Sequence, residues 1–191
     1  MCCARRPGGF AASLAHAEFD PSRALVEPEA IARQFPEPAT PFTTPAFAPG
    51  RQDLTTHAEV FTFLDALARR SARIAIETVG RSQQGWAMAL VVLSGPRGFD
   101  AKLPTVLLLA QQHGNEPAGG EAALVLAQSL ATERSALLQR VNVLIVPRAN
   151  PDAAERFGRE SVSGIDVNRD HLLVRTPEVQ AVTAAVLRYA P

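Results

Sequence analysis

Apolar residues recur at helical spacing in one early segment of the chain. Thr56-His57-Ala58-Glu59 matches a capping box, in which the side chains of Thr56 and Glu59 bind the first free amides of a helix. The apolar positions that follow are three or four residues apart: Val60, Phe63, Leu64 and Leu67. The pattern predicts a helix that begins after Thr56 and buries this stripe.

Three further segments have the composition of strands. Residues 74–79 and 87–93 are rich in aliphatic and β-branched side chains, and the polar turn-forming segment 80–85 separates them. They are therefore predicted to form a hairpin at the edge of a sheet. Residues 105–110 have no polar face, which is typical of a strand that is covered on both sides, so we expect it to be central.

A helix and a further buried strand follow that apolar strand. Residues 121–130 are almost wholly apolar and come after Pro117, a favourable residue in a first helical turn. Residues 141–146 form the next strand, and residues 177–189 form a last helix capped by Thr176. This strand, helix and strand order predicts parallel strands. The expected fold class is α/β, with a mixed, largely parallel sheet and helices on both faces.

The first 53 residues lack a sustained periodicity. Residues 1–17 end in Ala15-His16-Ala17 and have the character of a signal-peptide remnant, although a plain alanine-rich start fits equally well. Residues 18–53 form a Pro-rich lead-in. Export to the periplasm or medium is one expectation, and a cytoplasmic location is the other. Residues 54–191 hold the predicted domain.

Charge and composition narrow the classes of partner. The chain has 191 residues, of which 47% are hydrophobic, and its 19 basic and 19 acidic side chains cancel. This composition indicates one globular domain. No basic run suggests a nucleic-acid partner, and no apolar run is long enough for a membrane span. Cys2 and Cys3 are adjacent, so they cannot bridge distant parts of a fold.

Chemically informative residues follow two of the predicted parallel strands. His113 and Glu116 come three residues apart after the strand 105–110, and Arg148-Ala149-Asn150 follows the strand 141–146. The carboxyl ends of parallel strands are where open α/β sheets bind ligands. An imidazole and a carboxylate at this spacing can converge on one Zn²⁺, but His113 could also cap the turn and Glu116 could favour a helix N-terminus.

Three segments occur in an informative order: His113-Gly114-Asn115-Glu116, then Asn150-Pro151-Asp152, then residues 164–169, Gly-Ile-Asp-Val-Asn-Arg. Together they resemble the carboxypeptidase A-like zinc peptidases, from about Thr56 to the last residue. The resemblance implies that His113 and Glu116 bind zinc.

The same resemblance assigns three residues to the substrate. It implies that Arg159 polarises the scissile carbonyl, and that Asn168 and Arg169 hold the terminal carboxylate of the substrate. The planar guanidinium of Arg169 suits a carboxylate because it can bind both oxygens. Arg156 lies close to Arg159, and either could be a solvated loop cation. Asp166 is expected to serve the turn and His57 to be a solvated helix residue.

The family pattern also calls for a second histidine ligand and a glutamate base after the Asn-Arg pair. His171 is the one histidine downstream of Arg169, and its place on the same loop makes it a poor substitute. We therefore expect the N-terminal portion of a longer, C-terminally truncated domain. An apolar face and a sheet edge should be uncovered, and the fragment should be inactive.

The predicted reaction is the attack of zinc-bound water on a C-terminal peptide bond. A desuccinylase-like hydrolase of N-acyl amino acids is an alternative, since it shares the His-x-x-Glu and Asn-Arg elements. Peptidoglycan peptides are a further class of substrate, and a non-catalytic protein that retains the carboxylate pocket is an alternative of another kind. The sequence does not indicate the oligomeric state.

Overall fold

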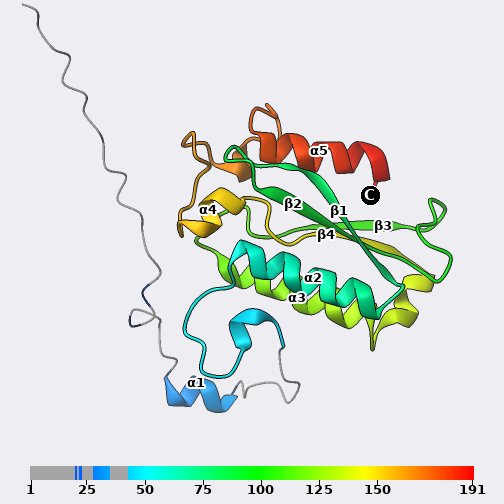
Figure 1. Ribbon diagram of the computed structural model, residues 1–191, viewed down its shortest axis with the longest axis horizontal. Coiled ribbons are helices and arrows are strands. Elements are labelled where there is room, and N and C mark those ends of the chain that lie inside the picture. The colour runs from blue at the N-terminus through cyan, green and yellow to red at the C-terminus, as the bar shows by residue number, and fades with distance from the viewer. Residues whose placement is uncertain (1–19, 21, 23–27, 35–42) are drawn as a thin grey trace, which may run out of the picture.

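The computed structural model describes residues 20, 22, 28–34 and 43–191 (Figure 1). The expected signal-peptide remnant at residues 1–17 lies outside the described residues. The described helices and strands, in chain order, are α1 (Glu29–Gln34), η2 (Pro45–Phe47), α2 (His57–Arg70), β1 (Ile74–Arg81), β2 (Ala87–Leu93), β3 (Thr105–Leu109), α3 (Pro117–Ala131), η3 (Ser135–Gln139), β4 (Asn142–Val146), α4 (Pro151–Glu155), η4 (Val167–Arg169) and α5 (Pro177–Tyr189).

The four strands form one mixed sheet in the order β1-β2-β4-β3. The predicted hairpin is present, because β1 and β2 pair antiparallel. The predicted parallel pair is also present: β3 and β4, which α3 connects in the sequence, pair in parallel. The mixed sheet is thus confirmed. Its parallel share is smaller than expected, since β2 and β4 pair antiparallel and one of the three described pairings is parallel.

The prediction that residues 105–110 form a central strand was wrong for the described sheet. β3 lies at the edge, and β2 and β4 occupy the interior. Leu107 and Leu109 pack into the core, whereas Val106 and Leu108 remain 44% and 37% exposed. An apolar run indicates what both faces of a strand prefer, but long-range pairing decides its neighbours. β3 therefore presents partly exposed apolar side chains at the edge of the described sheet.

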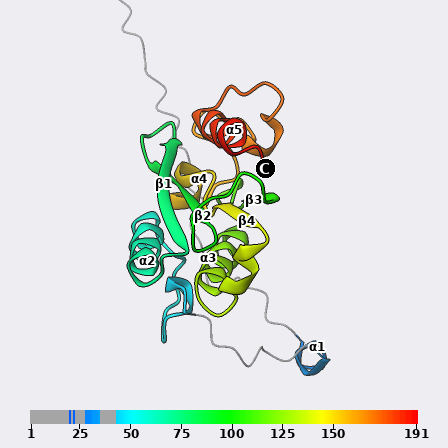
Figure 2. The ribbon, with the colours of Figure 1, turned by 90° about the vertical axis from the view of Figure 1, so that its right-hand side faces the viewer.

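Helices cover both faces of the sheet. α2 and α3 lie side by side on one face, and α5 lies on the other (Figures 1 and 2). The larger core fills the space between the sheet and the α2–α3 pair, where Leu64, Leu93, Leu124 and Ile145 are buried. A smaller core of inward-facing residues from β2 and β4 lies beneath α5. The sheet thus lies between two helical layers, and each layer buries apolar side chains against one face of the sheet.

The helix starts follow the local sequence. α2 begins with the complete capping box, in which Thr56 accepts from the Glu59 amide and Glu59 accepts from the Thr56 amide. Pro117 occupies the first turn of α3, and the Thr176 side chain accepts from the Val179 amide at the start of α5. These local interactions satisfy amides that have no partner inside the helix.

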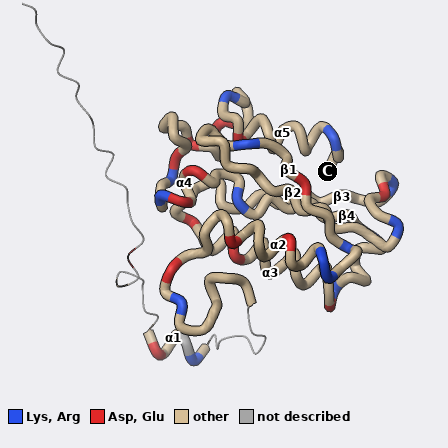
Figure 3. Tube along the Cα trace, in the orientation of Figure 1, with Lys and Arg blue, Asp and Glu red and all other residues tan. Residues whose placement is uncertain are grey.

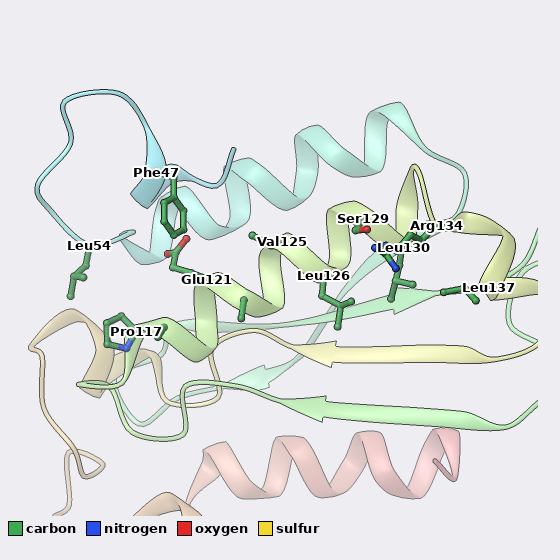
Figure 4. Close-up of a pocket in the computed structure, with 12 residues that line it drawn as sticks. Phe47, Leu54, Pro117, Glu121, Val125, Leu126, Ser129, Leu130, Arg134 and Leu137 are labelled. Carbon is green, nitrogen blue, oxygen red and sulfur yellow. The ribbon is translucent and has the colours of Figure 1, made fainter. Parts of the chain in front are cut away.

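The end of the lead-in packs along the outer side of α3. Thr43 and Thr44 donate from their hydroxyl groups to Gln128 and Glu121, which lie two helical turns apart. Beside them an apolar groove of about 680 Å³ runs along α3 (Figure 4). Its labelled lining includes Phe47 of η2 and Leu137 of η3, which follows α3 in the sequence.

Charged residues of both signs are scattered along the described trace (Figure 3). This mixed distribution agrees with the balanced composition, and no large area of one sign is apparent in this view. None of the helices described here combines the length and apolar character needed to cross a bilayer.

His57 is buried, so the prediction of a solvated helix residue was wrong. Its ring lies between those of Phe61 and Trp86, with centroid distances of 5.2 and 5.1 Å, and is 5% exposed. In the described structure neither ring nitrogen has a hydrogen-bond partner. Burial, and then the charge of Arg148, lower the pKa of His57. The histidine is therefore held in its neutral form by the fold.

His57 should make the stability of the chain depend on pH. Its pKa is lower in the folded state, so the unfolded state takes up the proton first and stability falls as pH drops below about 6.5. The contribution is at most about 1.4 kcal/mol per pH unit. Thermal unfolding at pH 7.5 and 5.5 should show a smaller difference for His57→Phe than for the wild type. His171→Phe, at an exposed position, should retain the wild-type difference. Equal pH dependence in all three chains would contradict this account.

Candidate active site

The parallel register of β3 and β4 brings two polar turns together. Leu109 pairs with Val146 at the end of the ladder, and the pairing continues beyond the strands. The amides of Ala149 and Asn150 donate to the carbonyls of Ala110 and Gln111. The turn that follows β3 therefore lies directly beside the start of α4.

Gly114 allows this close approach. A Cβ atom at this position would lie 2.0 Å from the backbone carbonyl carbon of Ala153, the third residue of α4. No rotation of a flexible side chain can relieve a contact with backbone. The Asn150 side chain adds two bonds here, because its oxygen accepts from the Ala153 amide and its nitrogen donates to the Gln112 carbonyl. The turn and the helix start form one packed unit.

His113 is 6% exposed and has a different carboxylate at each ring nitrogen. Nδ1 lies 3.0 Å from Oε1 of Glu116, three residues away in the same turn. Nε2 lies 2.9 Å from Oδ1 of Asp166, which comes from the loop before η4. Nδ1 and the Glu116 carboxylate thus contact each other, while Asp166 contacts the opposite side of the ring.

Asp166 does more than the turn role expected from its sequence. It does serve the turn, because Oδ1 accepts from the Asn168 amide at 2.9 Å. It also contacts His113 and, through Oδ2, the guanidinium of Arg159 at 3.2 Å. Burial acts to raise the pKa of Asp166, but the bonds from His113 and Asn168 and the charge of Arg159 outweigh it and lower the pKa. Asp166 is therefore an anion that orients the imidazole.

Arg159, rather than Arg156, reaches the His113 cluster. Its side chain is 46% exposed, and its two terminal nitrogens lie 3.3 Å from Glu116 and 3.2 Å from Asp166. Arg156 instead donates to the backbone carbonyls of Glu160 and Ser161. The two arginines therefore differ in their contacts: Arg156 binds the loop, and Arg159 faces the cluster.

Asn168 and Arg169 differ in their surroundings. Asn168 accepts from Gln112 Nε2 at 3.3 Å and lines a pocket of about 460 Å³ that also contains His113 and Glu116. Arg169 is exposed, and it makes one weak contact, of 3.4 Å, with the Asn168 carbonyl. The pocket is therefore lined by the His-Glu pair and Asn168, and Arg169 is not among its lining residues.

The donors present are compatible with part of a zinc site. Imidazole nitrogen and carboxylate oxygen are ordinary zinc ligands. A structural zinc site usually has four protein ligands, and a catalytic site has three protein ligands and a water. In the part of the chain that the structure describes, no group of three or more His, Cys, Asp or Glu side chains could hold a metal. His171 binds Gln112 Oε1 through Nε2 at 2.6 Å.

Comparison with known proteins assigns the family. A family model described as zinc carboxypeptidase matches residues 60–181, well over half of the chain. The chain belongs to the zinc carboxypeptidase family. The match includes the His113 turn, the β4–α4 junction and the loop that carries Asp166.

Three similar proteins illustrate the extent of the match. Carboxypeptidase 2 of Trichophyton rubrum is 29% identical over 163 residues, which are 78% of this chain and 30% of that protein. A metallo-carboxypeptidase from Burkholderia cenocepacia has a TM-score of 0.60 and 26% identity, over 71% of this chain and 38% of the other. Bovine thrombin-activatable fibrinolysis inhibitor has a TM-score of 0.63 at 17% identity, over 72% of this chain and 57% of the other. The chain thus spans about a third of the length of the Trichophyton rubrum carboxypeptidase.

Substitutions at two nearby glycines should have opposite effects. Gly114→Ala should destabilise the chain by at least about 2 kcal/mol, since the added methyl group meets the backbone of Ala153. Gly119→Ala is a matched control in α3, where the nearest atom is 3.8 Å away. It should be neutral or stabilising by up to about 1 kcal/mol, because alanine favours a helix. Urea unfolding measures both, and a tolerated Gly114→Ala would show that the close approach is not required.

Proposed function

We propose that this chain carries the N-terminal part of the active site of a zinc-dependent carboxypeptidase, with His113 Nδ1 and Glu116 as two zinc ligands. The observation that carries the proposal is the pair of contacts at His113. Nδ1 lies 3.0 Å from the Glu116 carboxylate, and Nε2 lies 2.9 Å from Asp166. Ligating histidines commonly have a carboxylate at the second nitrogen, which fixes the ring and raises its basicity.

The remaining residues of the cluster suit peptide hydrolysis. Zinc, when bound, would supply Lewis acidity toward a carbonyl and acidify a coordinated water. Arg159 presents a half-exposed guanidinium beside Glu116 and Asp166, where it could stabilise an oxyanion. Asn168 and Arg169 would hold the free carboxylate of the substrate through a neutral donor and a planar cation.

The described residues contain two of the proposed ligands, and no group of three or more His, Cys, Asp or Glu side chains among them could hold a metal. We therefore propose that this chain alone binds zinc weakly and turns over peptides slowly or not at all. Residues 54–191 would form the N-terminal portion of the catalytic domain, preceded by the lead-in. Export, indicated by the composition of residues 1–17, belongs to the same proposal.

Zinc binding should depend on the three residues around the imidazole. Competition with a chromogenic chelator should show that His113→Ala and Glu116→Gln abolish the affinity measured for the wild type. Asp166→Asn should weaken it by about 10- to 100-fold, because the orienting carboxylate is lost. His171→Ala is the control, and it should bind zinc like the wild type. Loss of zinc binding in His171→Ala with retention in His113→Ala would overturn this ligand assignment.

Carboxylate recognition should depend on Arg169. An N-acetylated dipeptide with a free C-terminal carboxylate should bind more tightly than the same dipeptide as its amide, as measured by NMR titration. Arg169→Met should weaken binding of the free acid by about 10-fold or more, and Arg169→Lys should recover part of the loss. Equal binding of acid and amide would contradict the assignment. Binding that is identical with zinc and with EDTA would favour a non-catalytic carboxylate-binding protein.

A further inference from the structure

Gln111, two residues before the proposed ligand His113, has an unusual backbone conformation. Its φ angle is +48°, in the left-handed region that residues other than glycine rarely adopt. The residue is buried, at the point where β3 ends and the turn begins. Such a conformation persists where surrounding contacts hold it, and it often occurs at functional sites. The side chain of Gln111 provides those contacts.

The Gln111 amide closes the turn from inside. Nε2 donates to the carbonyl of Gly114 at 3.0 Å, and Oε1 accepts from Nε of Arg148 at 2.9 Å. Both bonds are buried. The first bond spans the turn that presents His113, and the second ties the turn to Arg148, two residues after the end of β4. A buried amide with both ends satisfied is stabilising, whereas an unpaired one is costly.

Arg148 is anchored in turn by two other parts of the chain. This buried guanidinium donates to the Glu155 carboxylate at 3.0 Å and to the Thr55 carbonyl at 2.6 Å. Glu155 Oε1 also accepts from the amide of His57, the first residue of α2. The network therefore connects the N-terminus of α2, the end of α4 and the turn after β3.

We propose that Gln111, held by Arg148, is a positioning residue that sets the separation of His113 and Glu116. Its amide fixes the carbonyl of Gly114, which lies between the two residues in the sequence, so the chain's own contacts hold the two donors close together. That the positioned point is a zinc site rests on the proposed function. The ordering of the turn does not, because every contact that it uses joins residues of the chain itself.

Two variants separate positioning from general stability. Gln111→Met removes both side-chain bonds at nearly constant size. Gln111→Glu retains the acceptor for Arg148, and pairs charge with it, but loses the donor to Gly114. If the Gly114 bond orders the turn, both variants should loosen it, although Gln111→Glu keeps the link to the rest of the network. Gln112→Met is the matched control for turn order, since its wild-type side chain binds Asn168 and His171 instead of the turn.

Amide hydrogen exchange of the chain in EDTA measures turn order without metal. The Asn115 and Glu116 amides, which donate to Gly158 and His113, should exchange at least 10-fold faster in both Gln111 variants. Amides in α5 should be unchanged, and so should the turn amides in Gln112→Met. Zinc affinity, measured by chelator competition, should fall at least 10-fold in both Gln111 variants.

Other results have distinct meanings. Unchanged exchange at Asn115 and Glu116 in Gln111→Glu would overturn the positioning role. An equal rise throughout the chain, including α5, would also overturn it, because Gln111 would then contribute only to global stability. A local rise in a chain whose wild type binds no zinc would support the positioning of the turn and contradict the weak zinc binding proposed for this chain.

Discussion

The parallel pairing of β3 with β4 is the constraint on which the candidate site depends. Because the two strands run in the same direction and in register, their carboxyl ends lie at the same end of the sheet. The His113 turn and the Asn150-capped start of α4 are therefore neighbours. Gly114 permits their backbones to touch, so the position of His113 is determined by main-chain packing as well as by side-chain bonds.

The cluster combines a local pair with a distant loop. His113 and Glu116 belong to one turn, whereas Asp166 and Arg159 come from the segment after α4. The charges alternate around the imidazole, with a carboxylate at each nitrogen and a guanidinium that bridges both carboxylates. This arrangement holds the ring from two sides and leaves Glu116 and Arg159 accessible at the surface. The segment that matches the zinc carboxypeptidase family model, residues 60–181, contains all four of these residues.

Buried polar groups distinguish the site end of the domain from its apolar cores. Arg148 and Gln111 are buried there, and their hydrogen bonds are made to one another, to Glu155 and to backbone carbonyls. Burying such groups is costly unless each is paired, so the network constrains the local geometry strongly. At the edge strand β3 the situation is reversed, because the apolar side chains of Val106 and Leu108 remain partly exposed.

The sequence by itself determined the local elements and the family motifs. The capping box of α2, the apolar stripe of that helix and the His-x-x-Glu spacing depend on residues within a few positions of one another. Only the tertiary structure decided that β3 lies at an edge, that His57 is buried and that Asp166 reaches His113 across 53 positions. Strand order, burial and such contacts depend on pairing between distant segments, and local periodicity carries no information about which distant partner a residue meets.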